Sequence, residues 1–404
     1  MLNRLVNSGI ERWVNGIRRS HNLPIQLSLW NGKIFDLGIF ESPIVRVHVR
    51  DASALPLLFT SSVNSLTEAY ITERIDVDGK LEEVVDAVYR MSVRSKPASR
   101  TNRSRQWDKT SIRYHHDVSN DFYKLWLDER MVFSCGDFES GKETLDEAQL
   151  KKIDRVLSEI GLQSGQSLLD IGCGWGALVM RAAATYGARC VGVTLSENQY
   201  QLATERVRAA GLSDRVEIRL ADYRDLRGTF ERITNVGMFE HIGRDHLPSY
   251  FSKVHCLLAD GGILLDHRIT NSDSGEGDTQ VPGGEFVGGF MLPSGEHSHI
   301  SLVTRALRES GLEAIDIQDL GQYCAATLRC WAERYEQHTE RIRQTIGETK
   351  YRAWRVYLAG CAHAFSIRNV SAHQIVCQKA GGIASMRSGV PAVNLRQRGG
   401  IARG

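Results

Sequence analysis

The sequence predicts an α/β protein built on a doubly wound parallel sheet, preceded by a small α+β domain. Two observations lead to this prediction. From about residue 145 onward, strand-length apolar runs alternate with helical segments, and such alternation is typical of parallel sheets with helices on both faces. Residues 1–92 instead combine helical spacing with hairpin signals, which indicates a separate mixed domain.

The N-terminal domain is expected over residues 1–92. Apolar side chains recur at helical spacing over residues 2–17, which fits a core helix or a helix lying on an anionic membrane, and we favour the core helix. The remaining expected elements are strands at 24–30 and 44–49, a hairpin turn at Asn31-Gly32, and helices over 64–92 around a turn at 76–79.

Two basic segments lie outside the expected domains. Residues 93–113 contain seven basic residues but one acidic residue, Asp108. We interpret this segment as a linker that is either a solvated tether or a contact for lipid phosphates. Residues 381–404 contain no acidic residue and many Gly, Ser and Arg residues, so we expect a disordered basic tail there.

A second domain is expected over residues 114–380. Its predicted strands are 168–171, 190–194, 216–220, 233–238 and 263–267, separated by helices at 146–160, 176–187, 197–210 and 247–258. Residues 271–300 are Gly-rich without a periodic pattern, which is typical of a lid or binding loop. Residues 301–313 and 324–380 are predicted to be helical.

Composition narrows the function classes. The formal net charge is only +2, so we expect no nucleic-acid partner. The eight cysteines contain no CxxC pair and no Cys/His cluster, so we expect no metal site and a reduced, cytoplasmic compartment without a disulfide framework. No apolar run approaches the length of a membrane span. Any membrane contact is therefore expected to be peripheral, on the inner face.

The glycine-rich stretch after the first strand predicts the cofactor. Gly172, Gly174 and Gly176 follow a buried strand that ends near Asp170. Glycines at such a place allow a ligand to approach the backbone, although the triplet alone also fits a structural turn or other nucleotide-binding folds. A dinucleotide enzyme would carry an acid at the end of the second strand, and residues 191–196 have none. With Asp170 and Tyr223, this favours S-adenosylmethionine (SAM).

Seven motifs, spread over most of the second domain, resemble those of the cyclopropane-fatty-acyl-phospholipid synthase family, which includes the mycolic acid cyclopropane synthases. The resemblance covers about residues 64–380, and the N-terminal domain is similar to the smaller, lipid-binding-like domain of the phospholipid-acting members. The motifs lie at residues 114–123, 133–135, 172–176, 192–199, 239–243, 321–323 and 358–365.

The resemblance implies a SAM-dependent methyltransferase fold for residues 114–380 and a homodimer that contacts unsaturated phospholipid in a bilayer. It implies methylene addition to cis double bonds of acyl chains, through a carbocation that bound bicarbonate deprotonates. The matching catalytic residues are Cys135, Glu240, His267, Ile269 through its backbone, Tyr323 and Cys361. The matching SAM-binding residues are Phe133, Ser134, Asp170, Gly172, Gly174, Trp175, Gly176, Thr194, Leu195, Gln199, Tyr223 and Arg224.

Each catalytic candidate also has a structural interpretation. His267 could be a core histidine, Glu240 a helix cap, Tyr323 a packing residue, and Cys135 and Cys361 ordinary buried thiols. The sequence also departs from the family. Phe133 and Asp137 replace tyrosines, His116 stands where a tyrosine is common, and residues 292–296 differ from the usual lid.

These departures leave other functions open. The alternatives are a SAM-dependent enzyme that makes methyl-branched or methylene acyl chains, a catalytically inactive lipid-binding protein, and a methyltransferase for a soluble small molecule.

Overall fold

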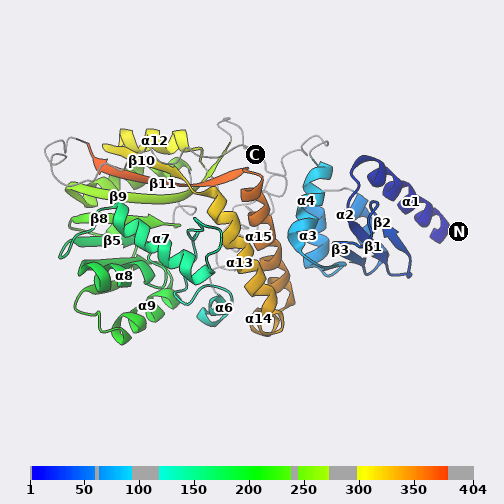
Figure 1. Cartoon of the computed structure of the whole chain (residues 1–404), viewed down its shortest axis with the longest axis horizontal. Helices are drawn as coiled ribbons and strands as arrows, with labels where there is room; N and C mark the ends of the chain where they lie inside the picture. The colour runs from blue at the N-terminus through cyan, green and yellow to red at the C-terminus, as the bar shows by residue number, and fades with distance from the viewer. Residues whose placement is uncertain (1, 60–62, 93–117, 238–243, 273–297, 381–404) are drawn as a thin grey trace.

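The computed structural model describes residues 2–59, 63–92, 118–237, 244–272 and 298–380 (Figure 1). The chain forms a four-stranded sheet followed by a seven-stranded sheet. The predicted linker and tail, Glu240, and the altered lid at 292–296 lie outside the described residues. Within the described residues, no helix has both the length and the apolar character that crossing a bilayer requires.

The N-terminal sheet has the order β2-β1-β3-β4. Its elements are α1 (Leu2–Ser20), β1 (Ile25–Leu29), β2 (Ile34–Asp36), β3 (Val45–Val49), η1 (Ala52–Ala54), α2 (Leu55–Phe59), α3 (Val63–Ile71), β4 (Ile75–Asp78) and α4 (Leu81–Ser92). Ile10, Val14 and Ile17 of α1 are buried in the core of this domain, which confirms the core interpretation of the first helix. The predicted turn at 76–79 was wrong, because residues 75–78 pair with β3 as a strand.

The larger sheet has the order β10-β11-β9-β8-β5-β6-β7. Its strands are β5 (Ser167–Ile171), β6 (Arg189–Thr194), β7 (Val216–Leu220), β8 (Phe230–Val236), β9 (Leu258–Asn271), β10 (Leu312–Asp319) and β11 (Val370–Lys379). Strands β5 to β9 pair in parallel, and β11 pairs antiparallel with both of its neighbours. Because β5 lies between β6 and β8, the strand order reverses there, and open α/β sheets bind ligands at such a point.

Helices cover both faces of the larger sheet, as the sequence predicts (Figure 1). Helices α7 (Leu145–Glu159), α8 (Ala177–Tyr186) and α9 (Glu197–Ala209) share one apolar core with the sheet. Helices α10 (Leu247–Leu257) and α12 (Ile300–Glu309) form a second core. The sheet is therefore doubly wound. The edge formed by the carboxyl ends of its parallel strands is not covered by these helices, and a third group of elements lies near it.

That third group consists of α6 (Asn120–Lys124), α13 (Gly321–Gln337), α14 (Thr339–Ile346) and α15 (Glu348–Ser366). Their side chains form an aromatic-rich core with Trp175 of the glycine-rich stretch. The predicted continuous helical region over 324–380 was wrong at its end, because β11 forms a strand. Strand β10 was also missed. Both strands are defined by pairing with distant residues, which local periodicity does not reveal.

Helix α15 also packs against the N-terminal domain. Val356 and Ala359 belong to the apolar core of that domain. The buried guanidinium of Arg352 donates to the carbonyl oxygens of Tyr70 at 3.0 Å and Ile75 at 3.2 Å. Buried carbonyls need such partners, so this arginine joins the two parts of the molecule.

Candidate active site

The glycine-rich loop forms a shelf at the carboxyl end of β5. Gly172, Gly174 and Gly176 all have positive φ, at 81°, 54° and 84°. The backbone N–H groups of Gly172 and Cys173 donate to the carbonyl oxygen of Val193 at 2.9 and 3.0 Å, which fixes the loop against β6. A Cβ atom built on Gly174 would meet no other atom within 4 Å. The space there suits close approach of a ligand, next to the N-terminus of α8.

Asp170 lies buried beneath this shelf. The Thr234 hydroxyl donates to its Oδ1 at 2.7 Å. Desolvation raises the pKa of Asp170 to about 6, against the lowering effects of Thr234 and Lys152. A buried carboxylate in this place has an energetic reason to accept a cationic ligand.

The second strand ends in a polar pair in place of an acid. The Thr194 hydroxyl donates to Gln199 Oε1 at 2.7 Å. This bond orients the Gln199 amide, whose NH2 group can donate to a ribose hydroxyl. Leu195 is 71% exposed just beyond the strand, where an apolar side chain can contact the face of a ligand.

Tyr223 and Arg224 follow β7 in the short helix η2 (Tyr223–Asp225). The Tyr223 ring packs edge-on against Tyr250, with centroids 5.4 Å apart. The exposed Arg224 guanidinium donates to Asp222 at 2.9 and 2.5 Å. Tyr223 is therefore held in place for stacking, whereas the charge of Arg224 is already paired.

Trp175 is buried, and its contacts reveal a residue that the sequence analysis did not single out. The indole Nε1 donates to Asn120 Oδ1 at 2.7 Å, and Asn120 Nδ2 donates to the carbonyl oxygen of Asn198 at 3.0 Å. Asn120 thus joins the glycine-rich loop to the start of α9. Its position within the 114–123 motif is the only sequence signal for this role.

An aromatic wall adjoins the shelf. The Phe133 ring lies 5.1 to 5.9 Å from the rings of Tyr123, Trp126 and Trp331, yet its side chain is 38% exposed. A partly open phenyl ring on a packed aromatic cluster offers an apolar surface to a ligand. Phe133 has no hydroxyl group, unlike the tyrosine that the family resemblance implies at this position, so this surface is apolar.

Ser134 lies between α7 and the end of β8. Lys152 Nζ donates to its hydroxyl at 2.7 Å, and Gln149 Nε2 donates to its carbonyl oxygen at 2.7 Å. A Cβ atom on Gly237 would lie 3.5 Å from the Ser134 Cβ. Asp137, which follows this motif and also departs from the family, forms an ion pair with Arg155, whose Nε donates to the Asp137 carboxylate at 2.8 Å.

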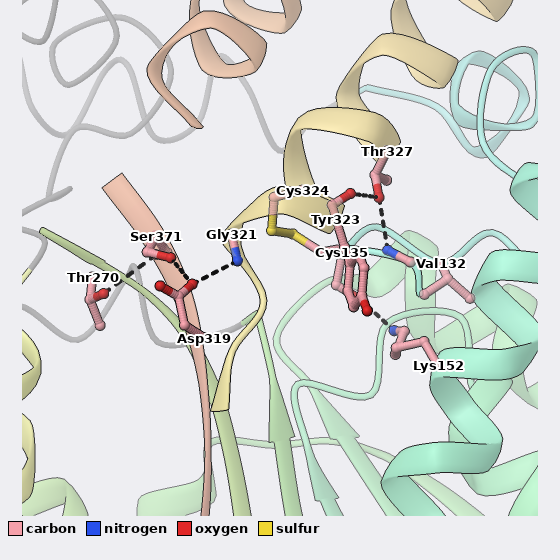
Figure 2. The surroundings of a disulfide bond; sticks show 12 residues. Val132, Cys135, Lys152, Thr270, Asp319, Gly321, Tyr323, Cys324, Thr327 and Ser371 are labelled. Carbon is pink, nitrogen blue, oxygen red and sulfur yellow. Dashed lines mark hydrogen bonds between the residues drawn. A yellow bond between two sulfur atoms is a disulfide. The ribbon is translucent and has the colours of Figure 1, made fainter. Parts of the chain in front are cut away.

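Cys135 is not a free thiol, contrary to the expectation of reduced cysteines. It forms a disulfide with Cys324 of α13 (Figure 2). The sequence gives no signal for this bond, because the two residues are 189 positions apart. The disulfide holds the 133–135 motif beside Tyr323, and Thr327 reinforces the contact by accepting from Gly136 N at 2.9 Å. Any role of Cys135 in an anion cage consequently falls to its backbone.

His267 lies on β9, 3% exposed. Burial, and then the charges of Lys152 and Arg155, lower its pKa to about 3, so the imidazole is neutral at ordinary pH. Among the described residues, its Nδ1 atom has no hydrogen-bond partner. Buried polar atoms are rarely left unpaired, and this atom can therefore make a hydrogen bond to a ligand.

The other catalytic candidates have separate surroundings. Ile269 and Tyr323 are partly buried against the aromatic-rich core. Cys361 of α15 packs against the same core, and burial raises its pKa to about 12, which keeps the thiol protonated and a poor nucleophile. Glu240 lies outside the described residues.

The strand order and the residues along the carboxyl edge define a SAM-dependent methyltransferase, an enzyme that takes SAM as methyl donor. The family described as "Mycolic acid cyclopropane synthetase" matches residues 103–375. The chain belongs to this family. Residues 13–97 match a family described as "Domain of unknown function (DUF7884)".

Known proteins agree with this assignment. A "Probable fatty acid methyltransferase" of Pseudomonas putida is 37% identical over 369 residues, which are 89% of this chain and 93% of that protein. The structure of the cyclopropane synthase MmaA2 from Mycobacterium tuberculosis is 32% identical with a TM-score of 0.64, and covers 67% of this chain and 98% of its own. The mycolic acid cyclopropane synthase CmaA1, solved in complex with SAH and CTAB, is 33% identical with a TM-score of 0.63 over 67% of this chain and 98% of its own.

Proposed function

We propose that this enzyme adds a methylene group from SAM across a cis double bond in an unsaturated phospholipid acyl chain, giving a cyclopropane. The observation that carries the proposal is the neutral, buried His267, whose Nδ1 atom lacks a partner among the described residues. A histidine that stays neutral can donate one hydrogen bond to an anion without protonating it. Family resemblance supports bicarbonate as that anion.

SAM would supply the methyl group and bicarbonate would serve as the base. The shelf of Gly172 and Gly174, with Asp170 beneath it and Gln199 beside it, would hold the donor. A donor with a positive sulfonium fits the negative charge of Asp170, because opposite charges stabilise each other strongly at a buried site.

The acceptor side needs an apolar, water-free space. An alkene requires no activation by a side chain, but the carbocation formed after methyl transfer reacts with any nearby water. The rings of Phe133, Trp126 and Trp331 pack together and give this space an apolar wall, and aromatic faces also stabilise cations.

Proton removal from the added methyl group would close the ring. For this step the proposed cage uses His267, Tyr323, and the backbone at Cys135 and Ile269 as hydrogen-bonding groups around the anion. Glu240 would accept the hydrogen bond from the hydroxyl of bicarbonate. Two electrons from the departing C–H bond form the new C–C bond, so no oxidant is required.

Phospholipid as substrate, peripheral membrane contact and a homodimer are part of the same proposal and are supported by family resemblance. The N-terminal domain supports them as well, because such a domain resembles that of the phospholipid-acting members.

A second candidate is a SAM-dependent enzyme that makes methyl-branched or methylene acyl chains. The 37% identical relative named "Probable fatty acid methyltransferase" favours it. Both candidates share methyl transfer to the double bond and differ in the fate of the carbocation. Loss of a methyl proton with ring closure gives the cyclopropane, whereas a hydride shift onto the cation followed by loss of a methyl proton gives the methylene chain. Loss of a proton from a chain carbon instead gives a methyl-branched chain that keeps a double bond.

Lipid NMR after incubation separates these candidates. The full chain would be incubated with SAM and vesicles of dioleoyl phospholipid, and S-adenosylhomocysteine formation would be measured in parallel. Upfield cyclopropane protons support the first candidate, vinylic or branched-methyl signals support the second, and no S-adenosylhomocysteine with any unsaturated lipid contradicts both.

The variant Glu240→Gln tests the cage. Binding of S-adenosylhomocysteine should be unchanged, while turnover should fall about 10²- to 10⁴-fold, the usual contribution of acid–base groups. Near-normal turnover would rule out Glu240 as the partner of the base.

A further inference from the structure

Lys152 is an unusually placed cation in the same site. It lies on α7, and its side chain is only 2% exposed. Its Nζ atom donates to the Ser134 hydroxyl at 2.7 Å. Lysine is rarely buried without a compensating partner, and a hydroxyl compensates a full positive charge poorly.

Two carboxylates, Asp128 and Asp170, lie close enough to affect Lys152, and each has other partners. Asp128 accepts from the backbone N–H groups of Val132 at 2.7 Å and Arg130 at 3.0 Å, and Asp170 accepts from Thr234. In the described part of the chain, Lys152 makes no ion pair with either carboxylate. Its charge is therefore available to a further anion.

The charge of Lys152 acts on the space around His267. Lys152 and Arg155 both lower the pKa of His267, so the potential at the imidazole is positive. Arg155 is already bound to Asp137 and Glu159, which leaves Lys152 as the cation with the fewer anionic partners. A positive potential beside an unpartnered, neutral imidazole nitrogen favours a small oxyanion.

We propose that Lys152 is a positioning residue for the reaction's anion, stabilising a small oxyanion beside His267 through its buried charge and through Ser134. The Ser134 hydroxyl accepts from Lys152, so its own hydrogen is free to point toward the site. This inference rests on the proposed function, because the anion meant is bicarbonate.

The charge of Lys152 also makes anion binding sensitive to pH. Burial, with a smaller effect of Arg155, lowers the pKa of Lys152 to about 8 against the opposing effects of Asp128 and Asp170. Between pH 7 and 9 its charged fraction falls from about nine-tenths to about one-tenth. Of the other groups around Lys152, Asp170 titrates near pH 6 and His267 near pH 3, and both lie below this window.

The test is calorimetric titration of the full chain with bicarbonate, with S-adenosylhomocysteine present, at pH 7 and pH 9. Wild-type affinity for bicarbonate should fall about tenfold over this range, in step with the charged fraction of Lys152. Lys152→Arg should remove this dependence, because a guanidinium stays charged at both pH values. Lys152→Met should bind bicarbonate about tenfold more weakly at pH 7 and show no change at pH 9.

Lys151→Met is the matched control. Lys151 is the neighbouring residue on α7 but pairs at the surface with Glu139 and Glu143, so its loss should leave bicarbonate binding unchanged. Equal bicarbonate affinity and equal pH dependence in Lys152→Met and wild type would overturn the inference and leave the proposed function standing. Absence of bicarbonate binding to the wild type would instead remove the base from the proposed function, whatever the lipid product is.

Discussion

The protonation state of one side chain, Asp170, should make the affinity for SAM depend on pH. Its pKa of about 6 means that it carries a charge at pH 7.5 and largely loses it by pH 5. We expect the affinity for SAM to fall about tenfold as the pH drops from 7 to 5, because the sulfonium loses its counter-charge. Calorimetric titration with SAM across this range provides the measurement.

S-adenosylhomocysteine serves as the control for Asp170, since it lacks the sulfonium charge and should show a smaller pH effect. Asp170→Asn should bind SAM weakly at every pH. An equal pH dependence for SAM and S-adenosylhomocysteine would contradict this explanation.

His267 makes the folded chain less stable when the pH falls, because the imidazole is buried in its neutral form. Its pKa is lowered to about 3 in the folded chain, whereas an unfolded histidine titrates near 6.5. Protonation therefore favours the unfolded state, so stability is present above pH 6.5 and is lost as the pH falls toward 3. Between pH 7 and 5 this residue should lower the free energy of unfolding by about 2 kcal/mol.

Denaturant unfolding of wild type and His267→Gln at both pH values isolates this contribution from that of the other histidines. The variant should lose less stability on acidification, by about the same 2 kcal/mol. Identical losses in the two proteins would mean that His267 is protonated in the folded state.

Which site residues the sequence predicts depends on how local their signal is. The glycine-rich loop and Asp170 are adjacent in the chain, so the sequence analysis could place them together. Lys152 could not be singled out, because it stands beside Lys151 in one amphipathic helix and nothing local separates a buried lysine from an exposed one. The disulfide between Cys135 and Cys324 is equally invisible, since only the fold brings the two cysteines together.

At the scale of elements, this disulfide ties the loop before α7 to the first turn of α13. Replacing Cys324 with Ala should lower the free energy of unfolding by about 2–5 kcal/mol, because the unfolded chain gains the freedom that the long closed loop had removed. Thermal and denaturant unfolding under non-reducing conditions would measure the loss. Cys256→Ser, an exposed free cysteine, is the control.

A reducing agent should bring the wild type to the stability of Cys324→Ala and leave the variant unaffected. If reduction changes neither protein, the two cysteines are not joined in solution, and the expectation of reduced thiols from the sequence would hold.

The sequence predicts strands correctly where the apolar pattern of a strand is clear and the strand pairs with another strand that is near in the chain. The expected strands at 168–171 and 216–220 correspond to β5 and β7, and both pair with β6, the strand that lies between them in the chain. Strand β11 comes after the three helices α13 to α15 and pairs with β9, a hundred residues earlier. A local pattern cannot predict such a partner, and the helical signal that precedes β11 was extended too far.

At the scale of the whole molecule, replacing Arg352 tests whether the N-terminal domain and the larger domain unfold together. Arg352→Met removes the donors to Tyr70 and Ile75 and leaves the Asp76 carboxylate without this partner. The Asp76 carboxylate is 30% exposed and keeps its ion pair with Arg50, so the main cost comes from the two buried carbonyls, at about 1–3 kcal/mol for each acceptor left without a donor. We expect unfolding to split into two transitions, with the N-terminal domain melting first.

Differential scanning calorimetry would resolve the two transitions. Arg305→Met is the control, because Arg305 is exposed and, among the described residues, its ion-pair partner is Glu309 on its own helix. Such pairs contribute about 0–1 kcal/mol. A single, unshifted transition in Arg352→Met would show that the apolar contacts of Val356 and Ala359 suffice.

Helix α15 packs against the N-terminal domain with one face and against the aromatic-rich core with the other, and this has an evolutionary consequence. Relatives that match only two thirds of this chain over nearly their whole length have no room for the N-terminal domain. In such relatives, the α15 face that carries Arg352, Val356 and Ala359 here is not covered by an N-terminal domain of this kind. Gain or loss of that domain during descent should therefore coincide with a change in polarity at the positions of Val356 and Ala359, while the opposite face of the same helix packs in the aromatic-rich core.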